Sequence, residues 1–336
     1  MKHDKILLAH GSGGKLSHDL VRDVFLPSFA NPVLEQLDDR AELNIEGRVL
    51  AFTTDSFVVN PVFFPGGDIG KLAICGTVND LAMGGAKPLF LSATFIIEEG
   101  LLTEELNSIV QSMKKTAEEA GVQIVTGDTK VVERGAADRI FINTSGIGLV
   151  PEGIAISGHN ARPGDKVIIN GYVGDHGIAV IAERHGLKFK NGIKSDCAPL
   201  HGLMEEILKV TQDIRVLRDP TRGGVATTLN EIAGQSGVGI LLNEKNIPVR
   251  DEVLAACELL GFDPLYVANE GKLLAIVPAE KADAVVGAIR RHRYGTEARV
   301  IGEVTADHPG KVVLKTAIGG SRIIDMLVGE QLPRIC

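Results

Sequence analysis

The chain ends in a thiol. A side chain at the end of a chain can reach more than one site. Cys336 is the last residue, on a tail that reads Leu-Pro-Arg-Ile-Cys. The sequence has only 4 cysteines among 336 residues, so a terminal cysteine is not expected by chance. A thiol with no residue after it can be reached by another protein and can also fold back into a pocket. A frayed end that merely finishes in cysteine is the alternative interpretation.

Carboxylates recur beside small residues in the first half of the chain. Asp55 stands in Thr-Asp-Ser, Asp80 in Asn-Asp and Asp128 in Gly-Asp-Thr-Lys. Each alone is typical of a turn or a helix cap. Together they are the hard oxygen ligands that Mg²⁺ takes beside a substrate phosphate. Lys130 would add a positive charge for a phosphoryl group, the alternative being an ordinary solvated lysine.

Glycine-rich turns supply candidate phosphate contacts. The stretch 10–14 reads His-Gly-Ser-Gly-Gly, and the stretch 218–224 reads Arg-Asp-Pro-Thr-Arg-Gly-Gly and leads into an expected helix. Glycines let backbone N–H groups approach an anion, and a helix N-terminus favours one, although a tight helix entry looks the same. The stretch 66–71 lacks the spacing of a P-loop, and no dinucleotide-binding fingerprint follows a strand. Glu270, in Asn-Glu-Gly-Lys, could act as a base or lie on the surface.

Composition narrows the class of protein. A chain of 336 residues suits two domains. A net charge of -8 and an aromatic content of 4% argue against a nucleic-acid partner. Neither a signal peptide nor an apolar run long enough for a membrane is found, so we expect a cytoplasmic protein without membrane contact. The spacing of Cys75, Cys197 and Cys257 fits buried apolar residues better than a zinc site.

The elements that must position these residues mix helices and strands without strict alternation, which predicts two α+β domains. The clearest helix is 103–120, where apolar residues recur at helical spacing and Gly121 ends the pattern. We divide the chain into a glycine-rich loop and helix (1–37), an N-terminal domain (38–157), a C-terminal α+β domain (158–310) and a strand with a mobile tail (311–336). Further helices are expected at 17–25, 69–82, 178–184, 200–210, 225–236, 252–260 and 282–291, and strands at 48–52, 88–97, 123–126, 139–150, 166–170, 239–242, 273–277 and 300–304.

Taken in order, these motifs resemble the HypE family of hydrogenase maturation factors. That family belongs to an ATP-binding superfamily with aminoimidazole ribonucleotide synthetase, selenophosphate synthetase and thiamine-monophosphate kinase. The Asp and Gly segments are shared across the superfamily, whereas the Pro-Arg-Ile-Cys ending is particular to HypE. The resemblance implies a two-domain PurM-like fold that forms a homodimer through its N-terminal domains, with ATP near that interface. The matching stretches span the chain: 9–14, 54–56, 64–72, 76–80, 126–132, 218–224, 269–272 and 333–336.

The resemblance also implies an activity. A carbamoyltransferase, HypF, loads a carbamoyl group onto the terminal cysteine, and ATP drives its dehydration to S-cyanate. The cyano group then passes to iron on the HypC–HypD pair as a ligand of the NiFe-hydrogenase centre. On this interpretation Asp55, Asp80 and Asp128 hold Mg²⁺, and Glu270 is the first choice of base, ahead of His10 and His176. Lys130 serves the phosphoryl group, and further nucleotide contacts come from Gly11, Ser12, Gly13, Gly14, Lys71, Asn79, Arg222, Gly223 and Gly224.

Two other functions are compatible with the same motifs. A small-molecule kinase or amidine-forming synthetase of the superfamily would share the aspartates but would not need Cys336. A nucleotide-sensing scaffold would use the tail only to dock partners. Deleting Cys336 separates these hypotheses, because only the dehydratase loses its product entirely.

Overall fold

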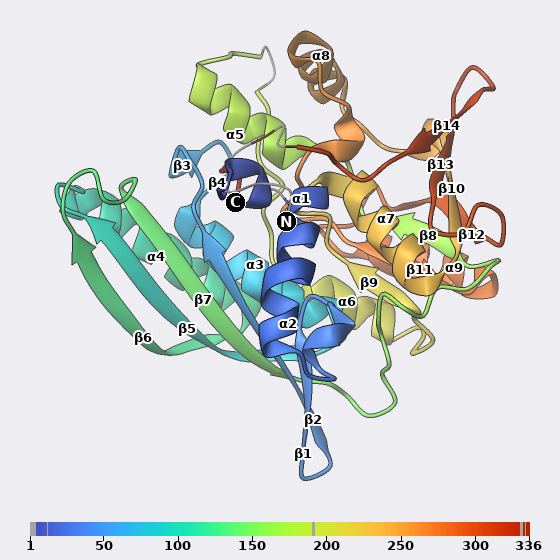
Figure 1. The fold of residues 1–336 in the computed structure, drawn as a ribbon, viewed down its shortest axis with the longest axis horizontal. Coiled ribbons are helices and arrows are strands. Elements are labelled where there is room, and N and C mark those ends of the chain that lie inside the picture. The colour runs from blue at the N-terminus through green and yellow to red at the C-terminus, as the bar shows by residue number, and fades with distance from the viewer. Residues whose placement is uncertain (1–4, 12, 190–191, 330–331, 333) are drawn as a thin grey trace.

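Two α+β domains pack side by side (Figure 1). The structure is a computed structural model that describes residues 5–11, 13–189, 192–329, 332 and 334–336. The N-terminal domain is built on a five-stranded sheet, which α3 (Ile69–Met83) and α4 (Thr103–Ala120) cover on one face. Strands β5 and β6 are parallel and the other pairs antiparallel. The strand order is β1 (Ala41–Ile45), β2 (Arg48–Phe57), β7 (Ile140–Leu149), β5 (Lys87–Glu98) and β6 (Gln123–Val132).

The C-terminal domain surrounds a seven-stranded sheet with helices. These are α5 (Asp175–His185), α6 (His201–Leu208), α7 (Gly224–Ser236), α8 (Asp251–Leu260) and α9 (Ala282–Arg291). All are close to the predicted helices. The strand order is β14 (Ser321–Ile324), β13 (Val312–Lys315), β10 (Gly239–Asn243), β12 (Arg299–Thr305), β8 (Lys166–Ile169), β11 (Leu274–Val277) and β9 (Val216–Arg218).

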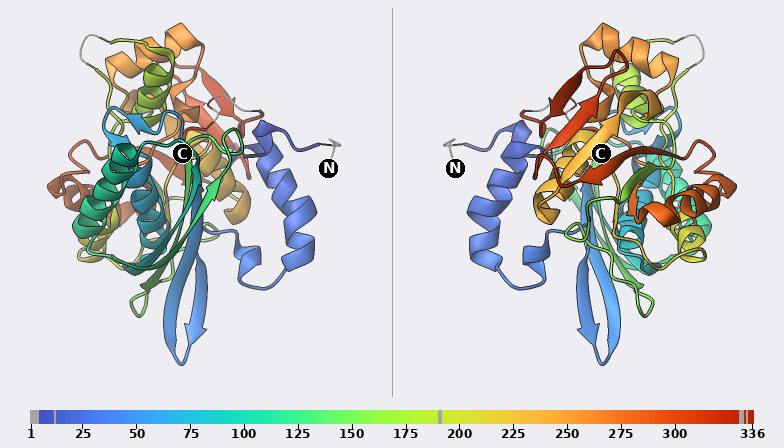
Figure 2. Two further views of the ribbon diagram at one scale, coloured as in Figure 1. Left: turned by 90° about the vertical axis from the view of Figure 1, so that its left-hand side faces the viewer. Right: turned by 90° about the vertical axis from the view of Figure 1, so that its right-hand side faces the viewer.

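A helical arm precedes the first sheet and stands out from the body (Figure 2). It consists of α1 (Lys15–Leu20), a π-helical turn (Val21–Phe25) and α2 (Leu26–Phe29), so the helix predicted at 17–25 is confirmed and is longer than expected. The arm is fixed at its first turn, where the Lys15 amide donates to the Leu327 carbonyl (2.9 Å) and His18 Nε2 contacts Glu231 Oε1 (2.9 Å).

The helix α3 lies in the core and carries several motif residues. Nearly all of its side chains are buried, as expected for a helix that is apolar all round. Gly76 permits this packing, because a Cβ there would lie 2.8 Å from the Phe57 ring. Within the described ranges, none of the helices combines the length and hydropathy needed to cross a lipid bilayer.

Several strands differ from the prediction. The strand predicted at 48–52 continues to Phe57 and so includes Asp55, and the strand predicted at 123–126 continues to Val132 and so includes Asp128. Short strands escaped prediction because few side chains define their pattern. These are β1, β9 and the two-residue hairpin of β3 (Phe63–Phe64) and β4 (Gly67–Asp68), and the single strand predicted within 311–336 is present as two, β13 and β14.

Candidate active site

The C-terminal tail is seated against both domains. The Asn60 amide donates to the Arg334 carbonyl (3.1 Å), and the Val58 amide donates to the terminal carboxylate of Cys336 (3.0 Å). From α5, Arg184 Nη2 also donates to the Arg334 carbonyl (2.7 Å). Most of these bonds join main-chain groups, so they can hold the tail whatever is attached to the thiol. The expected mobile tail is therefore docked in this structure; its Pro333 lies outside the described residues.

The side chain of Arg334 anchors the tail. Its guanidinium forms an ion pair with Asp138 and donates from Nε to the Val58 carbonyl (3.0 Å). Asn60 Nδ2 donates to the same Asp138 carboxylate (3.0 Å). The charged residue of the terminal motif thus fixes the tail two residues before the thiol.

His176 holds the tail from the opposite side. Its Nε2 lies 2.8 Å from the Ile335 carbonyl, and its Nδ1 lies 2.8 Å from Ser195 Oγ. Burial lowers the pKa of His176, so the ring is neutral and carries its proton on Nε2. The remaining nitrogen accepts from the hydroxyl of Ser195 and has no free lone pair. His176 thus holds the docked tail in this structure, and we infer a clamping role for it in place of the predicted role as a base.

His10 has a comparable constraint. Its Nδ1 accepts from the Leu7 amide (3.0 Å) within a short 3₁₀ turn, Leu8–Gly11. The His10 ring thereby stabilises the glycine-rich loop. Glu270, in contrast, has a carboxyl oxygen without a partner among the described residues, and it remains the first candidate for the base.

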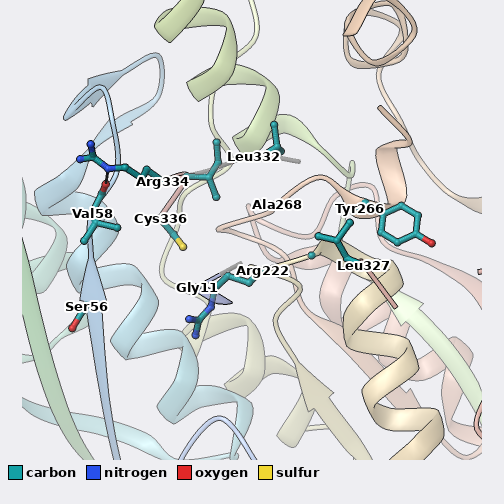
Figure 3. A pocket seen from close by; sticks show the side chains of 12 residues that line it. Gly11, Ser56, Val58, Arg222, Tyr266, Ala268, Leu327, Leu332, Arg334 and Cys336 are labelled. Carbon is teal, nitrogen blue, oxygen red and sulfur yellow. Dashed lines mark hydrogen bonds between the residues drawn. The ribbon is translucent and has the colours of Figure 1, made fainter. Parts of the chain in front are cut away.

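A cavity of about 100 Å³ surrounds the terminal thiol. Figure 3 shows the sulfur of Cys336 pointing into it, on the side of Arg222 and Gly11. This volume is below the ~300 Å³ of common ligand pockets, because the tail occupies part of the site. The lining residues are Gly11, Ser56, Val58, Arg222, Gly223, Tyr266, Ala268, Leu327, Leu332, Arg334, Ile335 and Cys336.

Buried charges surround the sulfur. Burial, with Glu270 nearby, raises the pKa of the Cys336 thiol to about 12, against the opposing effect of Arg222. Glu270 itself is 3% exposed, and its Oε1 has no hydrogen-bond partner within the described parts of the chain. Burial raises the pKa of Glu270 far above its usual range, and Cys197 and Asp219 add to the effect. An unpaired buried carboxyl group beside a thiol is typical of a catalytic site.

The predicted glycine turns meet at one rim of the cavity. Gly223 and Gly224 have positive φ angles (69° and 61°) and begin α7, and a Cβ on Gly224 would lie 2.5 Å from the Leu265 carbonyl. In the same turn, the buried hydroxyl of Thr227 has no partner among the described residues. A Cβ on Gly13 would lie 2.4 Å from Cβ of Arg222, so the N-terminal loop rests on this turn. Gly14 approaches the Leu327 carbonyl as closely, whereas Ser12 lies outside the described residues.

Two of the three predicted metal ligands lie in a cluster of buried carboxylates. Asp39 and Asp219, which were not among the predicted ligands, join Asp55 and Asp80 there. Burial and mutual repulsion raise the pKa of Asp219 to about 8, and that of Asp80 well above its usual range. Burial raises the pKa of Asp39 to about 6 against the opposing charge of Arg218, whose Nε lies 2.9 Å from its Oδ1. Crowded carboxylates of this kind favour a bound cation.

As the side chains stand, no group of three or more His, Cys, Asp or Glu residues in the described part of the chain could hold a metal ion. Asp219 could have been found from its place in Arg-Asp-Pro-Thr-Arg-Gly-Gly, directly after β9 and before a phosphate-type turn. Asp39 gave no comparable signal.

Asp128 lies elsewhere. In the sheet register Asp55 is aligned with Thr144, whereas Asp128 is aligned with Thr94 and, through it, with Asn143. Adjacent residues of a strand point to opposite faces, so Asp55 and Asp128 lie on opposite faces of the sheet. Grouping Asp128 with Asp55 and Asp80 is therefore wrong within one chain. Asp128 instead pairs with Lys130 (2.6 Å), and both side chains are more than half exposed.

Two other predicted nucleotide contacts have partners inside the protein. Asn79 Nδ2 donates to the Ala198 carbonyl (3.1 Å), and its Oδ1 accepts from the Leu200 amide (2.7 Å), so Asn79 joins α3 to the following domain rather than facing a nucleotide. Lys71 Nζ donates to the Gly66 carbonyl (3.0 Å) in the turn before α3.

Comparison with known proteins agrees with this architecture. Residues 37–150 match the N-terminal domain model of AIR synthase related proteins, and residues 162–315 match the C-terminal domain model. Carbamoyl dehydratase HypE of Cupriavidus necator is 54% identical, over 100% of this chain and 96% of its own length. The chain belongs to the HypE family. It is therefore a carbamoyl dehydratase of hydrogenase maturation, with the two PurM-like domains of that family.

Solved HypE structures have the same fold. The HypE–HypF complex contains a chain 52% identical to this one, with a TM-score of 0.88 over 92% of this chain and 99% of that one. A HypE structure in complex with ATP is 53% identical, with a TM-score of 0.84 over 99% of this chain and 100% of that one.

Proposed function

We propose that this HypE-family chain uses ATP to dehydrate a carbamoyl group carried on its own Cys336, which becomes an S-cyanate. The observation that carries the proposal is the position of the thiol, which points into the cavity on the side of Arg222 and whose pKa is raised by burial and by the nearby Glu270 carboxyl. The ATP complex of a HypE protein 53% identical to this chain supports the choice of nucleotide.

The residues around the thiol suit ATP and Mg²⁺. The positive-φ glycines before α7 and the free Thr227 hydroxyl fit phosphate oxygens, and Arg222 offsets their charge. Asp55, Asp80 and Asp219 are the carboxylates that would hold Mg²⁺ beside the nucleotide phosphates, because burial raises the pKa of each and a cation would offset their mutual repulsion. When bound, Mg²⁺ supplies charge neutralisation for phosphoryl transfer.

The chemistry follows from the poor leaving ability of an amide oxygen. In the proposed first step this oxygen attacks the terminal phosphoryl group, giving ADP and an O-phosphorylated imidate on Cys336. One of the two nitrogen protons passes to Glu270 as the neutral imidate forms, the second leaves with the departing phosphate, and the S–C≡N group remains. Arg222 stabilises charge on the transferred group, and the buried cavity keeps water from the intermediate.

Glu270 must be ionised to accept that proton. Burial is the main cause of the raised pKa of Glu270, repulsion from Cys197 and the nearby carboxylates adds to it, and together they favour the protonated form. A cation between Asp55 and Asp219 would remove part of that repulsion and lower the pKa of Glu270. Cation binding and preparation of the base are thereby coupled in this proposal.

The tail must leave the site to be loaded. We infer that a HypF carbamoyltransferase supplies the carbamoyl group, since a relative 52% identical forms a complex with HypF. The cyano group would pass to iron on a HypC–HypD pair. The four free thiols fit the reducing cytoplasm, where we place the protein.

We also propose a homodimer through the open face of the first sheet. Phe52, Ile147 and Phe90 are aligned across three strands, and each remains 38–40% exposed. Ile96 is 40% exposed, and Lys130, aligned with it on β6, places the Asp128–Lys130 pair beside this patch. Apolar residues gathered on one face favour an interface.

Intact-mass measurement tests the proposed activity. With HypF, carbamoyl phosphate, ATP and Mg²⁺, the chain should gain one carbamoyl group and then lose one water. The Cys336→Ser variant should show neither change. A wild-type chain that keeps the carbamoyl group through many ATP turnovers would contradict the proposal, and turnover by the Cys336→Ser variant would favour a small-molecule enzyme.

A further inference from the structure

The segment Ser195–Cys197 lies between the seat of the tail and the turn that carries Glu270. Ser195 is fixed by its amide, which donates to the Pro65 carbonyl (2.7 Å), and its hydroxyl contacts His176, the clamp on the tail. Two residues on, the Cys197 amide donates to the same hydroxyl (3.0 Å). One end of this short segment therefore fixes the group that holds Ile335.

The middle residue of the segment holds the Glu270 turn. Asp196 Oδ1 accepts from the Glu270 amide (3.1 Å), and Asp196 Oδ2 pairs with Lys272 Nζ (2.8 Å). The side chains of Asp196 and Lys272 are 5% and 9% exposed. Because Lys272 balances its charge, Asp196 can stay ionised while buried and can present its other oxygen to the backbone.

The turn packs directly on this segment. A Cβ on Gly271 would lie 1.8 Å from the Asp196 carbonyl oxygen, so only glycine permits this approach. The Glu270 carbonyl is held as well, by Asn79 Nδ2 and the Ala198 amide (both 3.4 Å). Both backbone groups of Glu270 are thus bonded, while its Oε1 remains without a partner in the described chain.

We propose that Asp196 is a positioning residue for the dehydration. Through the Glu270 amide it sets the place of the base, and through Ser195 and His176 the same segment sets the place of the tail. Base and substrate are thereby aligned by one rigid element rather than independently. This inference rests on the proposed function of Glu270 and adds to it the residue that directs its carboxyl group.

A matched pair of variants isolates the hydrogen bond to Glu270. Asp196→Asn with Lys272→Met removes the ion pair without leaving a buried charge and keeps an acceptor for the Glu270 amide. Asp196→Ala with Lys272→Met removes that acceptor too. We expect the second variant to dehydrate its carbamoylated Cys336 about 100-fold more slowly than the first, the scale of a small misplacement of a reacting group. The KM for ATP should be equal in both.

A second comparison shows whether Asp196 acts through Glu270. In a Glu270→Gln background the same two variants should differ less than about 3-fold, since coupled residues are not additive. If the alanine variant does not fold, as judged by thermal unfolding, Asp196→Glu replaces it, because it keeps the charge and moves the acceptor. Equal dehydration rates for the matched pair, an unslowed Asp196→Glu variant, or an undiminished difference in the Glu270→Gln background would overturn the inference. A wild-type chain that never loses water would instead refute the proposed function.

Discussion

Replacing His176 with phenylalanine tests whether the tail is docked in solution as it is in the structure. The imidazole donates from Nε2 to the Ile335 carbonyl (2.8 Å) and packs edge-on against Phe64, with ring centroids 5.5 Å apart. Phenylalanine keeps the aromatic contact and removes the donor. The Ile335 carbonyl then has to enter a buried position without this partner.

The expected loss can be worked from that one bond. Leaving a buried acceptor unpaired costs about 1–3 kcal/mol, and this cost falls on the docked state alone because water satisfies the free tail. Such a difference lowers the docking equilibrium constant about 5- to 150-fold. The remaining bonds to Arg334 and Cys336 persist, so the variant should still dock at a lower population.

Alkylation of Cys336 measures this population. Only a thiolate reacts, and burial raises the pKa of the docked thiol to about 12, so labelling reports the undocked tail. Cys75, Cys197 and Cys257 are 0–2% exposed and serve as unreactive references within the chain. His176→Phe should therefore label Cys336 about 5- to 150-fold faster than wild type. His185→Phe, at the exposed end of the same helix, is the matched control. Equal rates for wild type and His176→Phe would refute the proposed clamp.

Three further predictions follow from the charges and the open sheet face. The pKa of Cys336 is about 12 when docked and 9.0 when free, so docking is fully stable below pH 9 and weakens as pH rises toward 12. The free energy of docking falls by about 1.4 kcal/mol per pH unit in that window. Carboxypeptidase should therefore digest the tail faster as the pH rises, with the Cys336→Ala variant as the reference for the enzyme's own pH dependence. Because the pKa of Asp219 is about 8, the carboxyl is largely protonated at neutral pH, and Asp219→Asn should leave the melting temperature unchanged or higher. ATP-dependent dehydration should fall at least ~100-fold, because the amide cannot offer a charged oxygen to the cation. A lower melting temperature with intact activity would contradict the cation role. Ile147→Asp should yield a monomer in sedimentation, and a persistent dimer would place the interface elsewhere.

The sequence predicted the long elements well because their patterns are long. The helix Thr103–Ala120 has the predicted bounds, and α3 differs from its prediction by one residue. Apolar residues over four or five turns define one face of a helix without help from the rest of the fold. Strands of two to five residues have no such redundancy, and where one strand was predicted after residue 311 the structure has two that pair with each other, β13 and β14.

The misplaced metal ligand has a specific physical cause. The sequence predicts a strand that ends at residue 126, which would put Gly127 and Asp128 in the following turn, but Gly127 lies within β6. A glycine is needed at this position because β6 passes close to the β5 backbone, where a Cβ on residue 127 would lie 2.1 Å from the Ala93 carbonyl oxygen. The strand therefore continues, and its alternation directs Asp128 away from Asp55. Asp219 was missed for the opposite reason: it comes from the other domain, and only the fold brings it to Asp80.

The Cys336 thiol has to react outside the site, whereas the carbamoyl group that it carries has to react inside it. The group attached to the sulfur determines how tightly the tail docks. A docked thiol with a pKa of about 12 is a poor nucleophile, so carbamoylation has to occur with the tail outside. A carbamoyl group adds N–H donors and a carbonyl acceptor, for which Glu270 Oε1 and Arg222 are the available partners. A hydrogen bond to the charged Arg222 contributes about 1.5–3 kcal/mol, so the loaded tail should dock more tightly than the free one. The S-cyanate product has lost the N–H donors and with them the bond to Glu270. We therefore expect carbamoylation to favour the docked tail and dehydration to favour its release, so that the group on the sulfur sets the direction of the tail's movement.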